Sequence, residues 1–334
     1  MSSFPTNGDQ LNGFEEILRR YAMDAYESKV DLLMDVSPED KLFLLQYCRL
    51  DLQRIRNFHN TDLKIAPTGA HSTGGYHSDL SPVNIFGYSQ DVLESYRELR
   101  QLLPISVGLD LHLSPNLPSH TVDRMSRDMV DIRCQYEAEE ISISRPHSPF
   151  VTSAPMTRLS VYIRIVTRRA DRLEPVIDAI RRYAAHKGVG EIGRVVQTRI
   201  DVPCNRPEIV GRGHCLLDPI ANHTGTQIHH HREGYINNMT ITGQRLEAVM
   251  AARKEISDRF VLELEFEVTA ADSKALQVSG GRQLERICRQ FGVHILMKPG
   301  LNHNRRVVVI RGTDRAVSQL FDARQEIVNL MNNP

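Results

Sequence analysis

The sequence predicts an α+β fold in which one small unit, a three-stranded antiparallel sheet with three helices, occurs four times along 334 residues. Each unit opens with a run in which every second residue is apolar, which is the pattern of a strand with one buried face. Near the end of each unit a β-rich run closes and an amphipathic helix begins, and this junction recurs at residues 85, 165, 241 and 310. Intervals of this length suit a repeat of small domains.

The opening strands have apolar residues, with one threonine, at alternate positions. They are Val30, Leu32, Met34 and Val36; Val107, Leu109, Leu111 and Leu113; Val196, Thr198, Ile200 and Val202; and Leu262, Leu264, Phe266 and Val268. One apolar face and one polar face predict a half-exposed antiparallel sheet. A helical pair is expected after each strand, and then a middle strand at 63–65, 131–133, 227–229 or 294–296.

Glycine follows the last strand at three of the four junctions, in Ile85-Phe86-Gly87, Ile241-Thr242-Gly243 and Ile310-Arg311-Gly312, whereas Ile165-Val166-Thr167 has threonine. We interpret these glycines as residues that accept the backbone angles of a tight turn. The helices that follow have apolar spacings that face a core. The residues are Val92, Leu93, Tyr96 and Leu99; Leu173, Val176, Ile177 and Ile180; Leu246, Val249, Met250 and Arg253; and Val317, Leu320, Phe321 and Ile327.

The composition is that of a folded protein, with 41% hydrophobic and 25% charged residues. The formal net charge is zero, so the chain lacks the basic excess common in nucleic-acid-binding proteins; the largest basic excess is in 259–334, with 11 basic against 8 acidic residues. No apolar run is long enough for a membrane span, and no signal peptide is apparent, so we expect a cytoplasmic protein. The five cysteines form no CxxC pair, which favours reduced thiols over disulfides.

The order of elements resembles the type I KH domain, a βααββα fold that binds single-stranded RNA through a GxxG loop between its first two helices. The sequence is most similar to the tandem KH array of the Bicaudal-C family, and within it to a nematode germline member associated with a cytoplasmic poly(A) polymerase. The residues that carry this resemblance are Met34–Ser37, Pro115–Ser119, Gly211–Ile228 and Leu102-Leu103-Pro104. We expect a polar, disordered start at 1–13 and four KH domains at 14–103, 104–190, 191–258 and 259–334.

None of the four expected loop positions has a complete GxxG. They read Gln46-Tyr47-Cys48-Arg49, Pro115-Asn116-Leu117-Pro118, Gly211-Arg212-Gly213-His214 and Val278-Ser279-Gly280-Gly281. A side chain at a glycine position should exclude the phosphate from its usual approach. The third loop keeps its first glycine and a basic residue, so Gly211, Arg212, Gly213 and His214 are the candidate RNA-binding residues. The other three loops are expected to be packing or protein-contact surfaces.

Two other motifs match known ligand-binding patterns, but we favour a structural interpretation of both. Gly188-Val189-Gly190-Glu191-Ile192-Gly193 matches the dinucleotide fingerprint GxGxxG, but a helix is expected to end at Ala185 and a strand to start at Val195, so a helix cap and linker is the better interpretation. His229-His230-His231, with Cys204, Cys215, His214 and His223, could suggest zinc. Neighbouring residues of a strand point to opposite faces, so we predict no metal site.

No catalytic motif is present, and we expect neither an enzyme nor a cofactor. Glu137, Glu139 and Glu140 are interpreted as a solvated acidic turn, and Arg168-Arg169 and Arg305-Arg306 as surface pairs. The resemblance implies a scaffold in a cytoplasmic complex, including ribonucleoprotein granules, that controls translation and poly(A) tail length of germline messages. It also implies a cytoplasmic poly(A) polymerase and PUF-family repressors as partners. The alternative is a direct single-stranded RNA binder that uses the third repeat. Self-association is left open.

Overall fold

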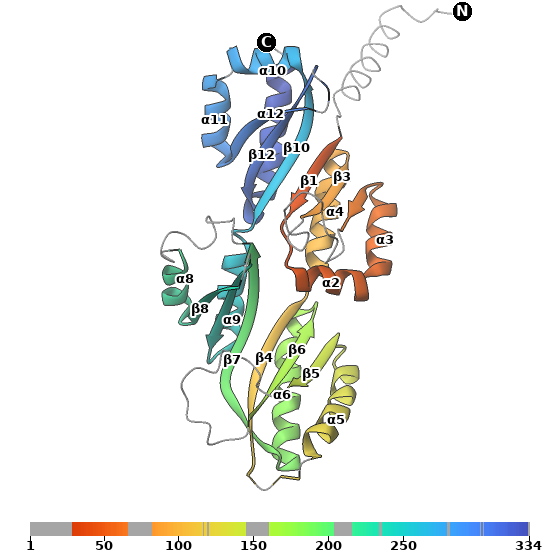
Figure 1. Ribbon diagram of the computed structural model, residues 1–334, viewed down its shortest axis with the longest axis vertical. Helices are drawn as coiled ribbons and strands as arrows, with labels where there is room; N and C mark the ends of the chain where they lie inside the picture. Colours follow the sequence, from red (N-terminus) through yellow and green to blue (C-terminus); the bar gives the residue numbers. More distant parts are fainter. Residues whose placement is uncertain are drawn as a thin grey trace, which may run out of the picture.

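A computed structural model describes residues 29–65, 82–115, 117–118, 120–144, 160–203, 216–233, 236–278, 281–300, 302 and 304–332. These residues form four structural segments, each with three strands. We number them in chain order as segment 1 (30–102), segment 2 (105–187), segment 3 (190–257) and segment 4 (261–332). In Figure 1 segment 4 lies at the top, segments 1 and 3 lie on opposite sides in the middle, and segment 2 lies at the bottom.

Segments 1 and 4 have the same order of elements, βααββα. In segment 1 the elements are β1 (Val30–Met34), α2 (Pro38–Tyr47), α3 (Arg49–Phe58), β2 (Asp62–Lys64), β3 (Val83–Gly87) and α4 (Ser89–Leu102). In segment 4 they are β10 (Val261–Thr269), α10 (Ala270–Val278), α11 (Gly281–Phe291), β11 (His294–Pro299), β12 (Arg305–Thr313) and α12 (Val317–Asn332), with a short 3-10 turn, η3 (Asp314–Ala316), before α12.

Segment 2 has one helix where the sequence predicted two. It contains β4 (Ile105–Leu113), α5 (Thr121–Gln135), β5 (Glu140–Ser144), β6 (Ser160–Thr167) and α6 (Ala170–Lys187). The middle strand predicted at 131–133 is wrong, because these residues belong to α5 and the strand follows at β5. Met125, Met129 and Ile132 recur every three or four residues and are all buried, so the helical period of the whole stretch outweighs the local Asp-Ile-Arg alternation.

Segment 3 contains β7 (Gly190–Pro203), α8 (Leu217–Thr224), β8 (Gln227–Glu233), β9 (Ile236–Gly243) and α9 (Leu246–Ser257). The strand β7 begins five residues before the predicted start at Val195, so most of the GxGxxG string is strand. Gly188 caps α6 in the left-handed conformation, at φ 63°, as a helix cap requires. The dinucleotide interpretation fails because a helix precedes this string and a strand contains its end.

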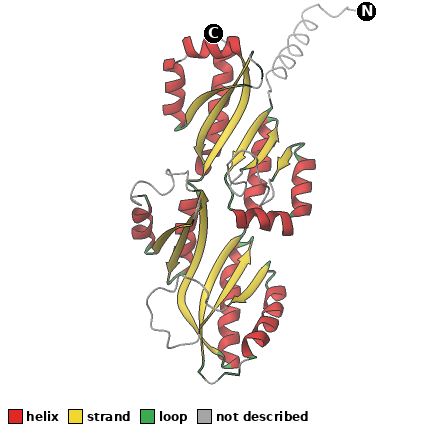
Figure 2. Ribbon diagram, in the orientation of Figure 1, coloured by secondary structure: helices red, strands yellow, loops and turns green. Residues whose placement is uncertain are grey.

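The strands assemble into two antiparallel six-stranded sheets that join segments distant in sequence (Figure 2). One sheet has the order β11-β12-β10-β1-β3-β2 and joins segment 4 to segment 1; the other has the order β5-β6-β4-β7-β9-β8 and joins segment 2 to segment 3. In both sheets the two opening strands pair at the centre, with Leu32 opposite Leu264 and Leu109 opposite Val196. We call these two central strand pairs the seams.

Each sheet has its own hydrophobic core, and the alternation predicted for the opening strands is confirmed. All sixteen residues named for these strands are buried, and each of the two cores contains side chains from both segments of its sheet. Val166, at the end of β6, belongs to segment 2 but packs in the core of segments 1 and 4. It therefore links the two cores. Each seam therefore lies within one continuous core to which two segments contribute.

The junction glycines are present where predicted, but the reason that we gave for them is wrong. None of Gly87, Gly243 and Gly312 has a positive φ. A Cβ added at these positions would lie 3.0 Å from Thr61 Cγ2, 2.9 Å from Val249 Cγ2 and 2.9 Å from Leu320 Cδ1. The glycines therefore let a neighbouring side chain, in two cases from the following helix, pack closely against the strand end. They do not serve the backbone angles of a turn.

Candidate nucleic-acid and protein-contact surfaces

The first expected loop, Gln46–Arg49, forms a junction between two helices with no room for an open loop. Cys48 ends α2 and precedes α3; its amide donates to Leu44 O at 3.1 Å, and its carbonyl accepts from Leu52 N at 2.8 Å. The Cys48 side chain is fully buried, and its Sγ lies 4.0 Å from Leu102 O. Burial raises the pKa of this thiol, so Cys48 serves as a packing residue and not as a reactive group.

The start of α3, where a KH domain would present helix amides to phosphate, carries a carboxylate instead. Asp51 lies in the first turn of α3, where a negative side chain interacts favourably with the helix dipole. Its Oδ2 accepts from Arg168 Nη1 of segment 2 at 2.9 Å. Arg168 also donates from Nε to Glu139 Oε1 at 2.7 Å. A second ion pair, between Arg164 of β6 and Glu39 of α2, joins the same two segments.

These contacts correct two sequence interpretations. Glu139 is not a solvated residue of an acidic turn, because its side chain is 14% exposed and holds Arg168. Arg168 is not a free surface residue, because it lies between Glu139 and Asp51. Asp51 and Arg168 are 117 residues apart in sequence, so no local pattern could have shown that they meet.

We expect the Arg168→Asp and Asp51→Arg variants each to be less stable than the wild type, and the double variant to recover part of the loss. Each single change places like charges opposite each other, whereas the double change restores an ion pair of reversed polarity. Because both groups are about one-third exposed, the coupling energy should be about 0.5–1 kcal/mol in a double-mutant cycle of urea unfolding. The control is the reversed pair Asp171→Arg with Arg169→Asp, an exposed pair within segment 2. Strictly additive effects at Asp51 and Arg168 would contradict this contact.

The second expected loop, Pro115–Pro118, follows β4 and does not lie between two helices. Pro115 and Pro118 are exposed, Leu117 packs against the core, and Asn116 lies outside the described residues. The residue before the loop, Ser114, donates from its amide to Val189 O at 3.0 Å and from Oγ to Gly188 O at 3.3 Å. The 115–118 loop therefore lies beside the GxGxxG string, and Ser114 holds the two together.

The third and fourth loops are described only in part. Gly211, Arg212, Gly213 and His214 lie outside the described residues, as do Cys204, Cys215, Ser279 and Gly280. Val278 ends α10 and Gly281 begins α11, so the fourth loop does lie between two helices. A Cβ added at Gly281 would meet nothing within 4 Å.

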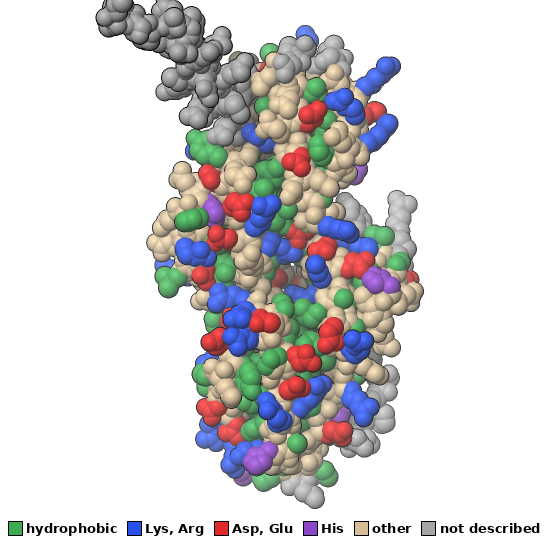
Figure 3. Space-filling model, turned by 180° about the vertical axis from the view of Figure 1, so that it is seen from behind, with side chains coloured by type: hydrophobic (Ala, Val, Ile, Leu, Met, Phe, Trp, Pro, Cys, Tyr) green, Lys and Arg blue, Asp and Glu red, His purple; other side chains and the backbone are tan. Residues whose placement is uncertain are grey.

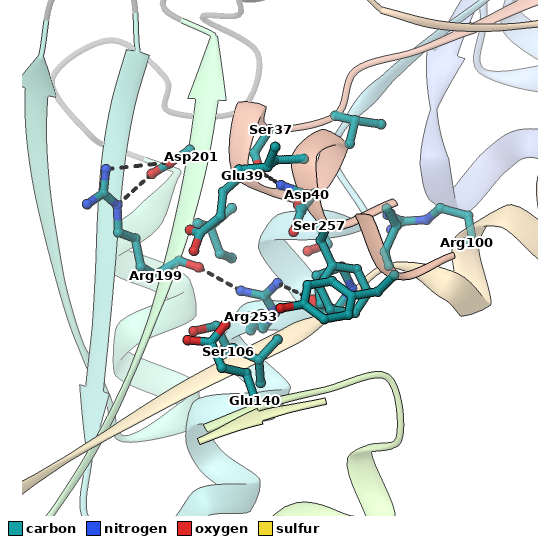
Figure 4. A pocket seen from close by; sticks show the side chains of 18 of the residues that line it. Ser37, Glu39, Asp40, Arg100, Ser106, Glu140, Arg199, Asp201, Arg253 and Ser257 are labelled. Atoms are coloured by element: carbon teal, nitrogen blue, oxygen red, sulfur yellow. Dashed lines mark hydrogen bonds and ion pairs between the residues drawn. The ribbon is translucent and has the colours of Figure 1, made fainter. Parts of the chain in front are cut away.

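Charged side chains from segments 1, 2 and 3 meet around a cavity of about 140 Å³ (Figure 4). Arg253 of α9 donates to Arg199 O at 2.7 Å, Thr198 Oγ1 at 3.2 Å and Pro104 O at 3.3 Å, so one guanidinium fixes the start of β4 against β7. Arg199 in turn donates to Asp201 Oδ1 at 2.8 Å. Burial raises the pKa of Asp40, and the positive charge of Arg253 acts against this rise. We call this group of residues the central junction.

A further ion pair joins segment 1 to segment 4. Arg100 of α4 donates to Asp314 Oδ2 in η3, and Arg97 Nη2 donates to Ser318 Oγ at 3.4 Å. Asp314 N also donates to Phe260 O at 2.7 Å, which fixes the chain as it passes from segment 3 to segment 4. The array is therefore linked by the two seams and by arginine–carboxylate contacts around them.

Comparisons with known proteins fit this architecture. A sequence profile of the KH-like domain of protein bicaudal C homolog 1 matches residues 263–334. The chain is 20% identical over 320 residues to "Protein bicaudal C" of Drosophila melanogaster, covering 92% of this chain and 33% of that protein. It spans about a third of that relative's length. A solved structure titled "KH domains" superposes with a TM-score of 0.58 at 17% identity, covering 90% of this chain and 84% of that one.

The match in segment 4 and the similarity along the chain support a Bicaudal-C family KH protein. The structural similarity supports the KH fold, with mixed helices and antiparallel sheets. A second solved structure, the regulatory subunit of aspartate kinase from Thermus flavus, covers 46% of the chain. Its TM-score of 0.22 is too low to indicate a shared fold.

The histidines of segment 3 that lie within the described residues do not form a cluster. His229 and His231 are exposed and His230 is half-buried, as alternation along β8 requires. His223 lies on α8, where its Nε2 is 2.8 Å from Glu255 Oε2. Within the described ranges no group of three histidine, cysteine or acidic side chains could hold a metal ion. Nor is any helix in those ranges long and apolar enough to cross a membrane.

The surface charge of the protein is mixed. On the face drawn in Figure 3, basic and acidic side chains alternate, and no continuous basic track runs across it. This distribution agrees with 41 basic and 41 acidic residues in the sequence. Many of the described arginines are paired with carboxylates; examples are Arg54 with Glu98 and Arg305 with Glu267.

The sequence interpretation missed the residues of the central junction, although one signal was present. Arg253 occupies a core-facing position of α9, after Leu246, Val249 and Met250. A charged residue in an apolar stripe must be paired or hydrogen-bonded when it is buried. That rule predicts a polar partner for Arg253, but the identity of the partner depends on how β4 meets β7.

Proposed function

We propose that this chain consists of four type I KH domains that act as a scaffold in a post-transcriptional regulatory complex, mainly through protein contacts. The family similarity and the KH fold suggest an RNA-regulatory role and a protein that is not an enzyme. The observation that carries the scaffold proposal is the closed loop position of segment 1, where Cys48 is packed in the core and Asp51 is paired with Arg168. A buried thiol and a carboxylate stand where an RNA phosphate would need open backbone and free helix amides.

The regulatory role follows from the resemblance to the Bicaudal-C family. We propose that the complex controls translation and poly(A) tail length of germline messages in the cytoplasm, with a poly(A) polymerase and PUF-family repressors as partners. The domains would extend over 14–103, 104–190, 191–258 and 259–334. The second candidate function, direct binding of single-stranded RNA, is favoured by the basic residue and the glycines that the third loop keeps, Gly211-Arg212-Gly213.

Fluorescence anisotropy with labelled random-sequence RNA at low and at physiological salt separates the two functions. The scaffold proposal predicts that binding at low salt is weak and is the same for Arg212→Glu as for a matched control, Arg245→Glu. Arg245 is an exposed arginine of the same segment, with a side chain that is 79% exposed. Micromolar, salt-dependent binding that is lost on Arg212→Glu and kept on Arg245→Glu would establish the direct RNA function instead.

A further inference from the structure

Segment 1 has an open groove between α3 and the outer strand β2, beside the closed helix junction. The groove has a volume of about 570 Å³. Its apolar floor includes Leu52 and Leu63, which are 8% and 6% exposed, and Ile65. Leu45, at the end of α2, adds an apolar side chain that is 39% exposed. An apolar floor with one open side is the form of a site for a partner's side chains.

The rim of this groove is polar and basic. Arg49 and Arg56 line it together with Gln53 and Asn57, and no carboxylate is among its lining residues. Strand β2 has one carboxylate, Asp62. Its Oδ1 lies 3.4 Å from Arg56 Nη2, and its Oδ2 lies 3.2 Å from Lys64 Nζ. The groove is thus lined by two cations, Arg49 and Arg56, and the adjoining strand adds one cation and one carboxylate, so the charge of this region is complementary to an acidic ligand.

The strand β2 offers backbone groups as well as side chains. It is the last strand of its sheet, and among the described residues it pairs only with β3. An outer strand has a row of free amides and carbonyls on its open side, to which an extended peptide can add as a further strand. Because α3 stands opposite β2 across the groove, a peptide paired to β2 would place alternate side chains over the apolar floor.

Among the described residues, exposed apolar side chains are most frequent in α2 and α3, the two helices next to the groove. Five of the nine large apolar side chains that are exposed in the described ranges lie within residues 42–58: Leu42, Leu45, Tyr47, Leu50 and Phe58. Leu45 lines the groove, whereas Leu42 and Tyr47 line the cavity of the central junction. Exposed apolar side chains in such numbers are typical of protein-contact surfaces.

We propose that the groove between α3 and β2 binds an extended peptide of a partner protein, in which aliphatic and acidic residues alternate, by adding it as a strand to β2. This proposal rests on the proposed scaffold function and identifies one of its contact sites. The aliphatic side chains would cover Leu52, Leu63 and Ile65, and the carboxylates would lie near Arg49 and Arg56. RNA is disfavoured here because the adjoining helix junction is closed by Cys48 and its helix start carries Asp51.

The test uses the full chain and a fluorescein-labelled peptide, Glu-Ile-Glu-Val-Asp-Leu-Glu, measured by anisotropy. We expect saturable binding that weakens about tenfold in the Arg49→Glu/Arg56→Glu variant, because two rim contacts become repulsive. The matched control is Arg54→Glu. Arg54 lies on the same helix and is paired with Glu98 at 3.0 Å, in the same way as Arg56 is paired with Asp62, but it does not line the groove. This control should bind within about twofold of the wild type.

Two readouts test the strand pairing itself. Hydrogen exchange of β2 amides should slow when the peptide is bound. Two peptides N-methylated at the odd or at the even positions should differ, because only one set of peptide amides faces β2 in an added strand. Equal binding of both methylated peptides, or unprotected β2 amides in the complex, would overturn the strand-addition proposal.

The other outcomes of these experiments also test the peptide-binding proposal. No binding of the peptide by the wild type, equal weakening in Arg54→Glu and in the groove variant, or displacement of the peptide by single-stranded RNA of similar length would each overturn the proposal. Failure of the peptide, with RNA binding still weak and unaffected by Arg212→Glu, removes this contact site and leaves the scaffold function in place. RNA binding lost on Arg212→Glu removes the scaffold function itself.

Discussion

Replacing Arg253 with alanine is expected to destabilise the protein by about 2–4 kcal/mol. The change removes three hydrogen bonds, to Arg199 O, Thr198 Oγ1 and Pro104 O. It also removes the positive charge that acts most strongly on Asp40, whose carboxyl is desolvated by burial. Asp40 is half-buried, and a partly desolvated carboxylate that loses a compensating positive charge is destabilising. The measurement is thermal or urea unfolding, with hydrogen exchange of β4 and β7 amides to locate the loss.

A second variant and a pH series identify the origin of this loss. In the Arg253→Ala/Asp40→Asn variant the uncompensated carboxylate is absent, so part of the stability should return. The pKa of Asp40 is already raised in the folded protein and should rise further without Arg253. A folded-state pKa above the unfolded value favours the folded state at low pH and loses this contribution as the pH rises. The deficit of Arg253→Ala should therefore shrink from pH 7 to pH 4; a deficit that is independent of both tests would show that Asp40 plays no part.

Replacing Gly190 with alanine should also have a large effect, about 2–4 kcal/mol. Gly190 lies at the end of the β4–β7 seam, opposite Leu113, with φ at +156°. A Cβ there would lie 2.1 Å from His112 O and 2.9 Å from His112 C, both backbone atoms of the paired strand. Backbone atoms cannot move aside as a flexible side chain can, so the seam must open or the strand must shift. Urea unfolding and hydrogen exchange of β4 amides measure the loss.

The matched control is Gly188→Ala, two residues earlier. Gly188 has φ at +63°, and nothing lies within 4 Å of its added Cβ. Its replacement should cost only about 1 kcal/mol, the cost of placing a side chain in the left-handed region. Similar losses at the two positions would show that the close approach to His112 is not what requires glycine at 190.

Individual segments were largely predictable from sequence because their periodicity is local. The alternation of Val30, Leu32 and Met34 identified a buried strand face, and Ile310-Arg311-Gly312 identified the last strand of its unit. Where two periods competed, at 131–133, the longer helical pattern of α5 prevailed. The site was less predictable. The absence of glycine from Gln46–Arg49 is visible in the sequence, but the sequence did not show that Asp51 and Arg168 meet there.

By itself the sequence determined the alternating strands, the strand-to-helix junctions and the absence of a complete GxxG in any repeat. Only the tertiary structure decided that segment 1 joins segment 4 and segment 2 joins segment 3. The physical reason is that every opening strand has the same free backbone groups at its edge, so its sequence does not specify which other edge it will meet. That choice depends on complementary side chains far apart in the chain, such as Arg100 with Asp314 and Arg253 with the carbonyl of Pro104.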